Sequence, residues 1–205
     1  MADDFPLDGM PPLDPSPDED AWEAFLLYAL EHMSGNPDNS LSNRQIREVE
    51  SVVGHQLPFE LGMLLVLGVP DGDRWWRWND DPAAQLAQWN ARLLDGILFD
   101  VEQNNLWLGS WGPRPARAAD RTENVTARFH RASTLFPIYG HRAMPLDIAA
   151  SEMSNDANPV LSIVQTDIVT YGADLAAWLH HEFQVPLPMW PPTGERIFAF
   201  WSDLM

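Results

Sequence analysis

The chain has 205 residues, a net charge of −18 from 30 acidic and 12 basic residues, and no cysteine. That length is enough for one domain with a substantial core, and a hydrophobic fraction of 45% with ten tryptophans is too high for a disordered chain. The charge disfavours binding to nucleic acid and to anionic membranes, and the missing cysteine excludes disulfides, thiolate catalysis and Cys-ligated zinc. The same charge would attract a basic protein partner, although a role in solubility alone explains it equally well.

Both ends of the chain differ in composition from the middle. Residues 1–19 are acidic and rich in proline, and we predict a flexible tail. Residues 20–185 are predicted to form one domain, and residues 186–205, again rich in proline, to pack back on it through an apolar end. We find no secretion signal and no apolar run of membrane-spanning length, so we expect a cytoplasmic protein without membrane contact.

Apolar periodicity predicts three helices at the start of the domain. Apolar residues between Trp22 and Met33 recur on one helix face. A second helix opens at Ser42, where Gln45 is placed to complete a capping box, and it closes at Gly54. A third, shorter helix starts at Pro58.

The rest of the domain mixes strands and helices. The predicted elements are a strand or sheet edge at 74–78, a helix at 81–95, a strand at 97–102, a helix within 116–133, strands at 135–139, 160–164 and 168–171, and a helix at 175–183. Pro137 indicates an edge position for its strand. This order predicts an α+β fold, with a central antiparallel or mixed sheet and N-terminal and C-terminal helices packed on it.

Tryptophans are concentrated between positions 75 and 111. On a strand, Trp76 and Trp78 would share one face and Trp75 would take the other. At least one of them would then lie at the surface or in a groove, where aromatic residues anchor protein partners. If helices cover both faces of the sheet, all of them pack in the core instead. The candidate partner-binding tryptophans are Trp75, Trp76, Trp78, Trp107 and Trp111.

Two acidic residues complete the candidate site. On a strand, Asp100 and Glu102 would share a face about 7 Å apart, a spacing that overlaps that of the carboxylate pairs of glycoside hydrolases. Any Asp-x-Glu strand has this property, so a polar sheet face is the simpler explanation, and we count both residues as partner-binding candidates. The six histidines lack metal-ligand spacing, and nucleophile and phosphate-binding motifs are absent. We therefore expect no metal, no cofactor and no catalytic residue.

Three sequence blocks, in this order, resemble the SUKH domain family. They are Leu41-Ser42 with Glu50, Gly54 and Leu57-Pro58; Leu98-Phe99-Asp100-Val101-Glu102 with Trp107 and Trp111-Gly112; and Leu135 to Arg142 followed by Asn158-Pro159-Val160 and Gln165-Thr166-Asp167. The resemblance covers roughly residues 41–184. The chain departs from it at Leu67-Gly68-Val69-Pro70, where the family often has an Asn-Gly pair.

The resemblance implies both a fold and a class of function. SUKH domains are α+β domains without catalytic residues. Bacterial members resemble the immunity proteins of polymorphic toxin systems, which bind and neutralise a toxin domain. Eukaryotic relatives, including a yeast cell-wall assembly regulator, are regulatory or scaffolding proteins. We therefore expect a non-enzymatic immunity protein that binds a toxin, with a regulatory adaptor as the alternative.

Overall fold

The computed structural model describes residues 19–146, 158–188 and 200–205. Residues 1–18 of the predicted acidic tail and residues 189–199 of the predicted C-terminal tail lie outside these ranges. The helices within them are α1 (Glu19–Met33), α2 (Asn43–Val53), α3 (Phe59–Leu67), α4 (Pro82–Gln103), α5 (Ala118–Phe129), α6 (Leu175–Phe183) and α7 (Trp201–Leu204), with short 3-10 turns η1 (Pro37–Asn39) and η2 (Gly109–Trp111). The strands are β1 (Leu135–Tyr139), β2 (Arg142–Pro145), β3 (Val160–Val164) and β4 (Asp167–Gly172).

The predicted α+β class is confirmed. The four strands form one antiparallel sheet in the order β1-β2-β3-β4, so β1 with Pro137 is an edge strand, as expected. Strand β2 was not predicted. It forms a hairpin with β1 through Gly140, whose φ of 56° is a backbone conformation that glycine adopts without steric cost.

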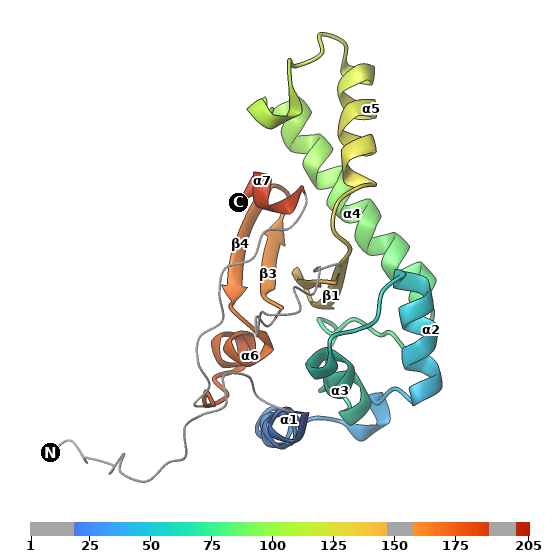
Figure 1. Ribbon diagram of the computed structural model, residues 1–205, viewed down its shortest axis with the longest axis vertical. Coiled ribbons are helices and arrows are strands. Elements are labelled where there is room, and N and C mark those ends of the chain that lie inside the picture. The colour runs from blue at the N-terminus through green and yellow to red at the C-terminus, as the bar shows by residue number, and fades with distance from the viewer. Residues whose placement is uncertain (1–18, 147–157, 189–199) are drawn as a thin grey trace, which may run out of the picture.

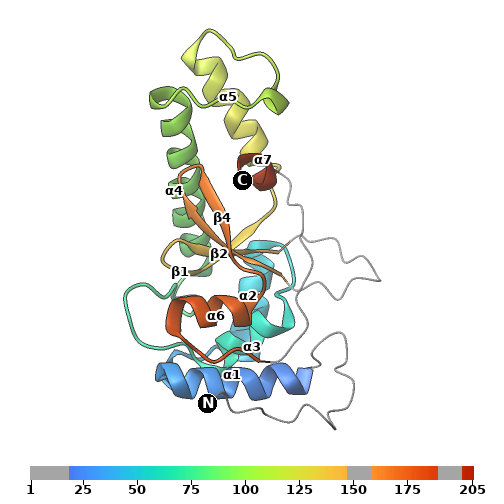
Figure 2. The ribbon, with the colours of Figure 1, turned by 90° about the vertical axis from the view of Figure 1, so that its left-hand side faces the viewer.

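Helices cover both faces of the sheet, and each face supplies side chains to a separate hydrophobic core (Figures 1 and 2). Strand residues such as Phe136 and Val160 pack with α1, α3 and α6 in the first core. Strand residues such as Leu161 and Ile168 pack with α4, α5 and α7 in the second core. Alternation along each strand therefore places successive side chains in different cores.

The longest helix, α4, replaces two predicted elements. A strand was predicted for residues 97–102, and this prediction was wrong, because residues 82–103 form one helix. The buried residues Trp89, Leu93, Ile97 and Val101 continue a single helical stripe across Gly96. α4 and α5 lie side by side, and together they extend beyond one end of the sheet (Figures 1 and 2).

The segment predicted as a strand or sheet edge at 74–78 is a loop that follows the edge of β1. Only Trp75 forms a bridge, with Tyr139. The backbone N–H of Trp76 donates to the Ile138 carbonyl, and the Gly140 N–H donates to the Arg74 carbonyl. The loop thereby satisfies backbone groups that an edge strand otherwise leaves unpaired.

Local capping follows the sequence prediction at α2. The Ser42 side chain and the Gln45 side chain form the reciprocal capping box, and Gly54 ends the helix in the left-handed conformation. Across the described parts of the chain, no helix combines the length and apolar character that crossing a bilayer requires.

Candidate functional site

The three tryptophans of the loop before α4 have different environments. Trp75 is buried and stacks on Phe183 at 5.6 Å between ring centroids. Trp78 is buried against Phe136, and its indole N–H donates to the Pro137 carbonyl. Both residues belong to the core, so neither offers its ring to a partner.

Trp76 is the half-buried member of this group. Its Nε1 donates to the Gly140 carbonyl at 3.2 Å, and its ring packs edge-on against Trp89 at 5.6 Å. It contacts both hydrophobic cores. The ring is thus fixed in position while part of it remains accessible.

An open pocket of about 370 Å³ lies beside Trp76. Its lining comes from the loop before α4, from the exposed face of α4 and from the β1–β2 turn; the residues are Asp73, Arg74, Trp75, Trp76, Arg77, Asp80, Gln85, Gln88, Arg92 and Gly140. The volume is at the lower end of the range of about 300–1,000 Å³ that is typical of ligand pockets. The lining combines tryptophan and arginine, which are the residue types most enriched at the energetic centres of protein interfaces.

The three arginines of the pocket differ in how far their charges are compensated. Arg74 lies 4.4 Å from the Tyr139 ring centroid and 3.6 Å from the Glu182 carboxylate. Arg77 donates to Asn39 and lies 3.8 Å from Asp71. Arg92 is exposed on α4, and no carboxylate of the described residues pairs with it.

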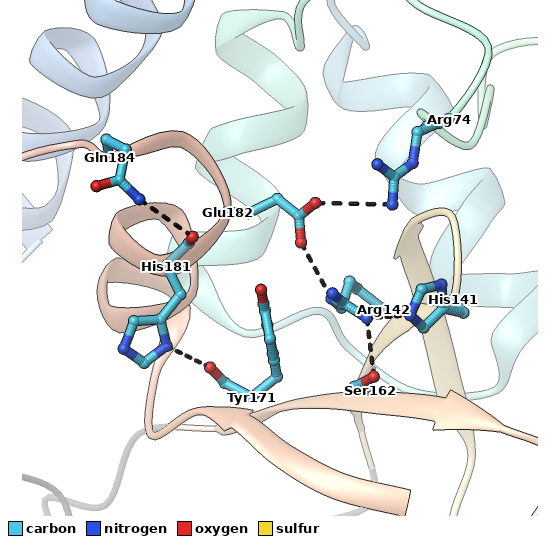
Figure 3. Close-up of polar contacts among 8 residues, drawn as sticks. All are labelled: Arg74, His141, Arg142, Ser162, Tyr171, His181, Glu182 and Gln184. Carbon is cyan, nitrogen blue, oxygen red and sulfur yellow. Dashed lines mark hydrogen bonds and ion pairs between the residues drawn. The ribbon is translucent and has the colours of Figure 1, made fainter. Parts of the chain in front are cut away.

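A charge network of Arg74, Glu182 and Arg142 adjoins the pocket through Arg74, which also lines it. Figure 3 shows the polar contacts of this network. The Glu182 carboxylate lies between the guanidinium groups of Arg74 and Arg142. Arg142 is 7% exposed, donates to the Ser162 hydroxyl at 2.8 Å, and lies over the Tyr171 ring at 3.8 Å. Glu182 thus compensates a buried cation, which would otherwise strongly destabilise the fold.

His141 is a partly buried histidine that lies among the arginines of this region. Burial lowers the pKa of its imidazole, and the charges of Arg142, Arg74 and Arg92 lower it further, while Glu182 opposes them. The side chain also contacts the Arg142 guanidinium. We therefore assign a neutral His141 at pH 7.

Asp100 and Glu102 do not form the carboxylate pair that a strand would have produced. Successive helical positions are rotated by about 100°, so positions two apart on α4 point to opposite sides. Asp100 is buried and accepts hydrogen bonds from the Thr166 N–H and hydroxyl and from the Asn104 amide. Glu102 accepts two hydrogen bonds from Arg121 of α5, at 2.7 and 2.6 Å. The two carboxylates thus hold a turn and a helix in place.

Trp107 and Trp111 lie beyond the C-terminal end of α4. They contact each other edge-on at 5.3 Å, Trp107 donates to the Gly112 carbonyl, and Trp111 is buried in the second core. The seven candidate residues therefore form two groups at different levels of α4, and only the group of Trp75, Trp76 and Trp78 adjoins the pocket.

The Arg-rich stretch at 114–131 makes local contacts. Arg121 pairs with Glu102, Arg117 lies 3.8 Å from Asp120, and Arg128 donates to the Trp111 carbonyl. These contacts indicate a structural role for the stretch.

Several residues of the pocket were missed from the sequence. Arg92, Gln85 and Gln88 are ordinary polar residues of an amphipathic helix, and no motif distinguishes them. Glu182 and Arg142 are 40 positions apart, so no local pattern could join them. The run Arg74-Trp75-Trp76-Arg77-Trp78 was the available signal, because tryptophan and arginine are enriched at the energetic centres of protein interfaces.

Within the described residues, no three His, Asp or Glu side chains come together as metal ligands. No protein-family model, no curated protein and no solved structure matches the chain.

Proposed function

We propose that the chain is a non-enzymatic protein-binding module that acts in the cytoplasm as an immunity protein and neutralises a bacterial toxin. The pocket beside Trp76 carries this proposal. It combines a rigid, partly accessible indole with arginine side chains, which is the composition of an interface hot spot. The resemblance of residues 41–184 to the SUKH family supports the same function.

The charge of the chain supports a basic partner domain. At −18, the molecule would raise the encounter rate with a positively charged toxin. The roles of Asp100 and Glu102 weaken the glycosidase alternative, because both carboxylates contact structural partners on different sides of α4. The pocket is therefore the better candidate for the functional surface.

Co-expression with the toxin encoded beside the gene tests this function. We expect cells that carry the toxin to survive only when this chain is present. A Glu102→Gln variant, although it loses the ion pair with Arg121, should still protect, because Glu102 lies outside the pocket. Equal survival with and without the chain would contradict the proposal, and a pull-down dominated by a housekeeping complex would favour a regulatory adaptor.

A further inference from the structure

The lining of the pocket beside Trp76 carries a formal charge of +1, on a molecule that is strongly negative as a whole. Three arginines line it against two aspartates, Asp73 and Asp80, whereas the chain as a whole carries −18. Glu182 and Asp71 compensate Arg74 and Arg77 in part. The guanidinium of Arg92 is without such a partner among the described residues, and it is the group most available to an anion.

The shape and chemistry of the lining restrict the anion. A guanidinium presents a planar fork of donors that matches a carboxylate, and the Gln85 and Gln88 amides on α4 add neutral donors. A volume of about 370 Å³ exceeds that of a single carboxylate group, so the site has room for the carbon chain that bears it. The accessible part of Trp76 provides an apolar surface for that chain.

We propose that this pocket binds an acidic side chain presented by a short peptide segment of the protein partner, with its carboxylate on Arg92 and its carbon chain against Trp76. The identity of the partner rests on the function proposed above, whereas the chemistry of the pocket does not.

The proposal separates two electrostatic roles within one complex. The net negative charge acts at long range and raises the association rate for a basic partner. The pocket acts only at contact, where a buried charge-assisted hydrogen bond slows dissociation. One acidic residue within a basic surface would also fix the orientation of the partner, because the molecule as a whole is strongly negative.

The ligand chemistry is testable without the toxin. N-acetylglutamate amide and N-acetylglutamine amide have nearly the same shape and differ in charge. Titration of each into the ¹⁵N-labelled full chain, at constant ionic strength, can be followed at the Trp76 Nε1–H and Arg92 Nε–H signals. We expect saturable shifts of both signals with the glutamate compound and at least tenfold weaker binding of the glutamine compound.

Two substitutions that each remove one positive charge provide the matched comparison. Arg92→Gln should abolish the saturable shift at Trp76. Arg117→Gln should leave it unchanged, because Arg117 is exposed at the start of α5 and outside the pocket. With the toxin, Arg92→Gln should raise the dissociation rate at least tenfold and Arg117→Gln should not.

Three results would overturn the inference. They are equal shifts with both compounds, saturable binding that persists in Arg92→Gln, and tighter binding of inorganic phosphate than of the glutamate compound, which would identify a phosphate site. Glutamate binding by a chain that gives no protection from the toxin would leave the pocket assignment intact and contradict the proposed function. Protection from the toxin without glutamate binding would support the proposed function and contradict the pocket assignment.

Discussion

At the scale of single residues, the two carboxylates of α4 show how acidic side chains contribute to this fold. Asp100 accepts hydrogen bonds from both the N–H and the hydroxyl of Thr166, and so fixes the β3–β4 turn against the helix. Glu102 and Arg121 form a two-point ion pair between α4 and α5, with side chains that are 28% and 14% exposed. Such fork-to-fork pairs fix geometry more strongly than single contacts between surface charges.

The Glu102–Arg121 pair should make stability depend on pH. The hydrogen bonds from Arg121 lower the pKa of Glu102 below its ordinary value of 4.5. A depressed pKa contributes stability that is complete above the unfolded-state pKa and is lost as the pH falls through the folded-state pKa. We therefore expect Glu102→Gln to lower the urea midpoint at pH 7, and the difference from the unaltered chain to shrink as the pH falls below about 4.5.

Asp95→Asn is the control for this effect. Asp95 is exposed on the same helix, and none of the described basic residues pairs with it. Asp95→Asn removes one negative charge, as Glu102→Gln does, but breaks no ion pair. The urea midpoint of this variant at pH 7 should therefore stay close to that of the unaltered chain. A Glu102→Gln difference that is independent of pH would show that the pair does not stabilise the folded state.

At the scale of elements, α4 shows where sequence patterns succeed and fail. The Asp95-Gly96 pair resembles a helix end, and the apolar run at 97–99 resembles a strand. The burial of Trp89, Leu93, Ile97 and Val101 shows that a helical spacing of four residues continues across the glycine. This periodicity is visible when all 22 residues of α4 are considered together. It is lost when the sequence is divided into two segments at Gly96.

Elements whose signals are local were predictable. The α2 caps and the β3–β4 hairpin depend on residues within a few positions of one another. The loop at 74–78 depends on β1, some 60 residues later, because Trp76 and Trp78 donate to carbonyls of Gly140 and Pro137. Only the tryptophans of the candidate site could be predicted from the sequence. Arg92 and Glu182 are brought close to them by the tertiary fold, which no local pattern shows.

The close approach of the β3–β4 hairpin explains why α4 has a glycine at position 96. A Cβ atom there would lie 3.1 Å from the Cα of Gln165, which has a φ of 57° in a turn held by Asp100. Gly62 in α3 has no atom within 4 Å of such a Cβ. Alanine favours a helix interior over glycine by about 1 kcal/mol. We expect Gly62→Ala to raise the free energy of unfolding by about 0.5–1 kcal/mol, and Gly96→Ala to give no gain or a loss.

Urea unfolding of the two variants, under identical conditions, measures this difference. The two substitutions are chemically identical, so helix propensity cancels and the contact with Gln165 remains. Equal stabilisation by both would mean that the β3–β4 turn does not pack closely on α4.

At the scale of the whole molecule, the sheet joins two cores that are otherwise separate. Each strand supplies one core with its even positions and the other with its odd positions, as Phe136 and Leu135 do in β1. Trp76 contacts both cores from the loop outside the sheet. Both cores depend on the same strand register, because a shift of one residue would exchange the side chains that face each core. We therefore expect a loss of packing in one core to disturb the other.

This arrangement predicts that the two cores unfold together. Leu64 is fully buried in α3 on the first core, and Leu64→Ala should lower the free energy of unfolding by about 3 kcal/mol. If the cores are coupled, native-state hydrogen exchange should show the same loss of protection at amides of the second core, such as those of Ile163 and Val125. Leu27→Ala, at a position 52% exposed, should change protection by less than about 0.5 kcal/mol anywhere. A loss of protection confined to amides of α1, α3 and α6 would instead show that the two cores unfold independently. Amides of α5 and β3 would then exchange by an unfolding reaction in which the first core stays folded.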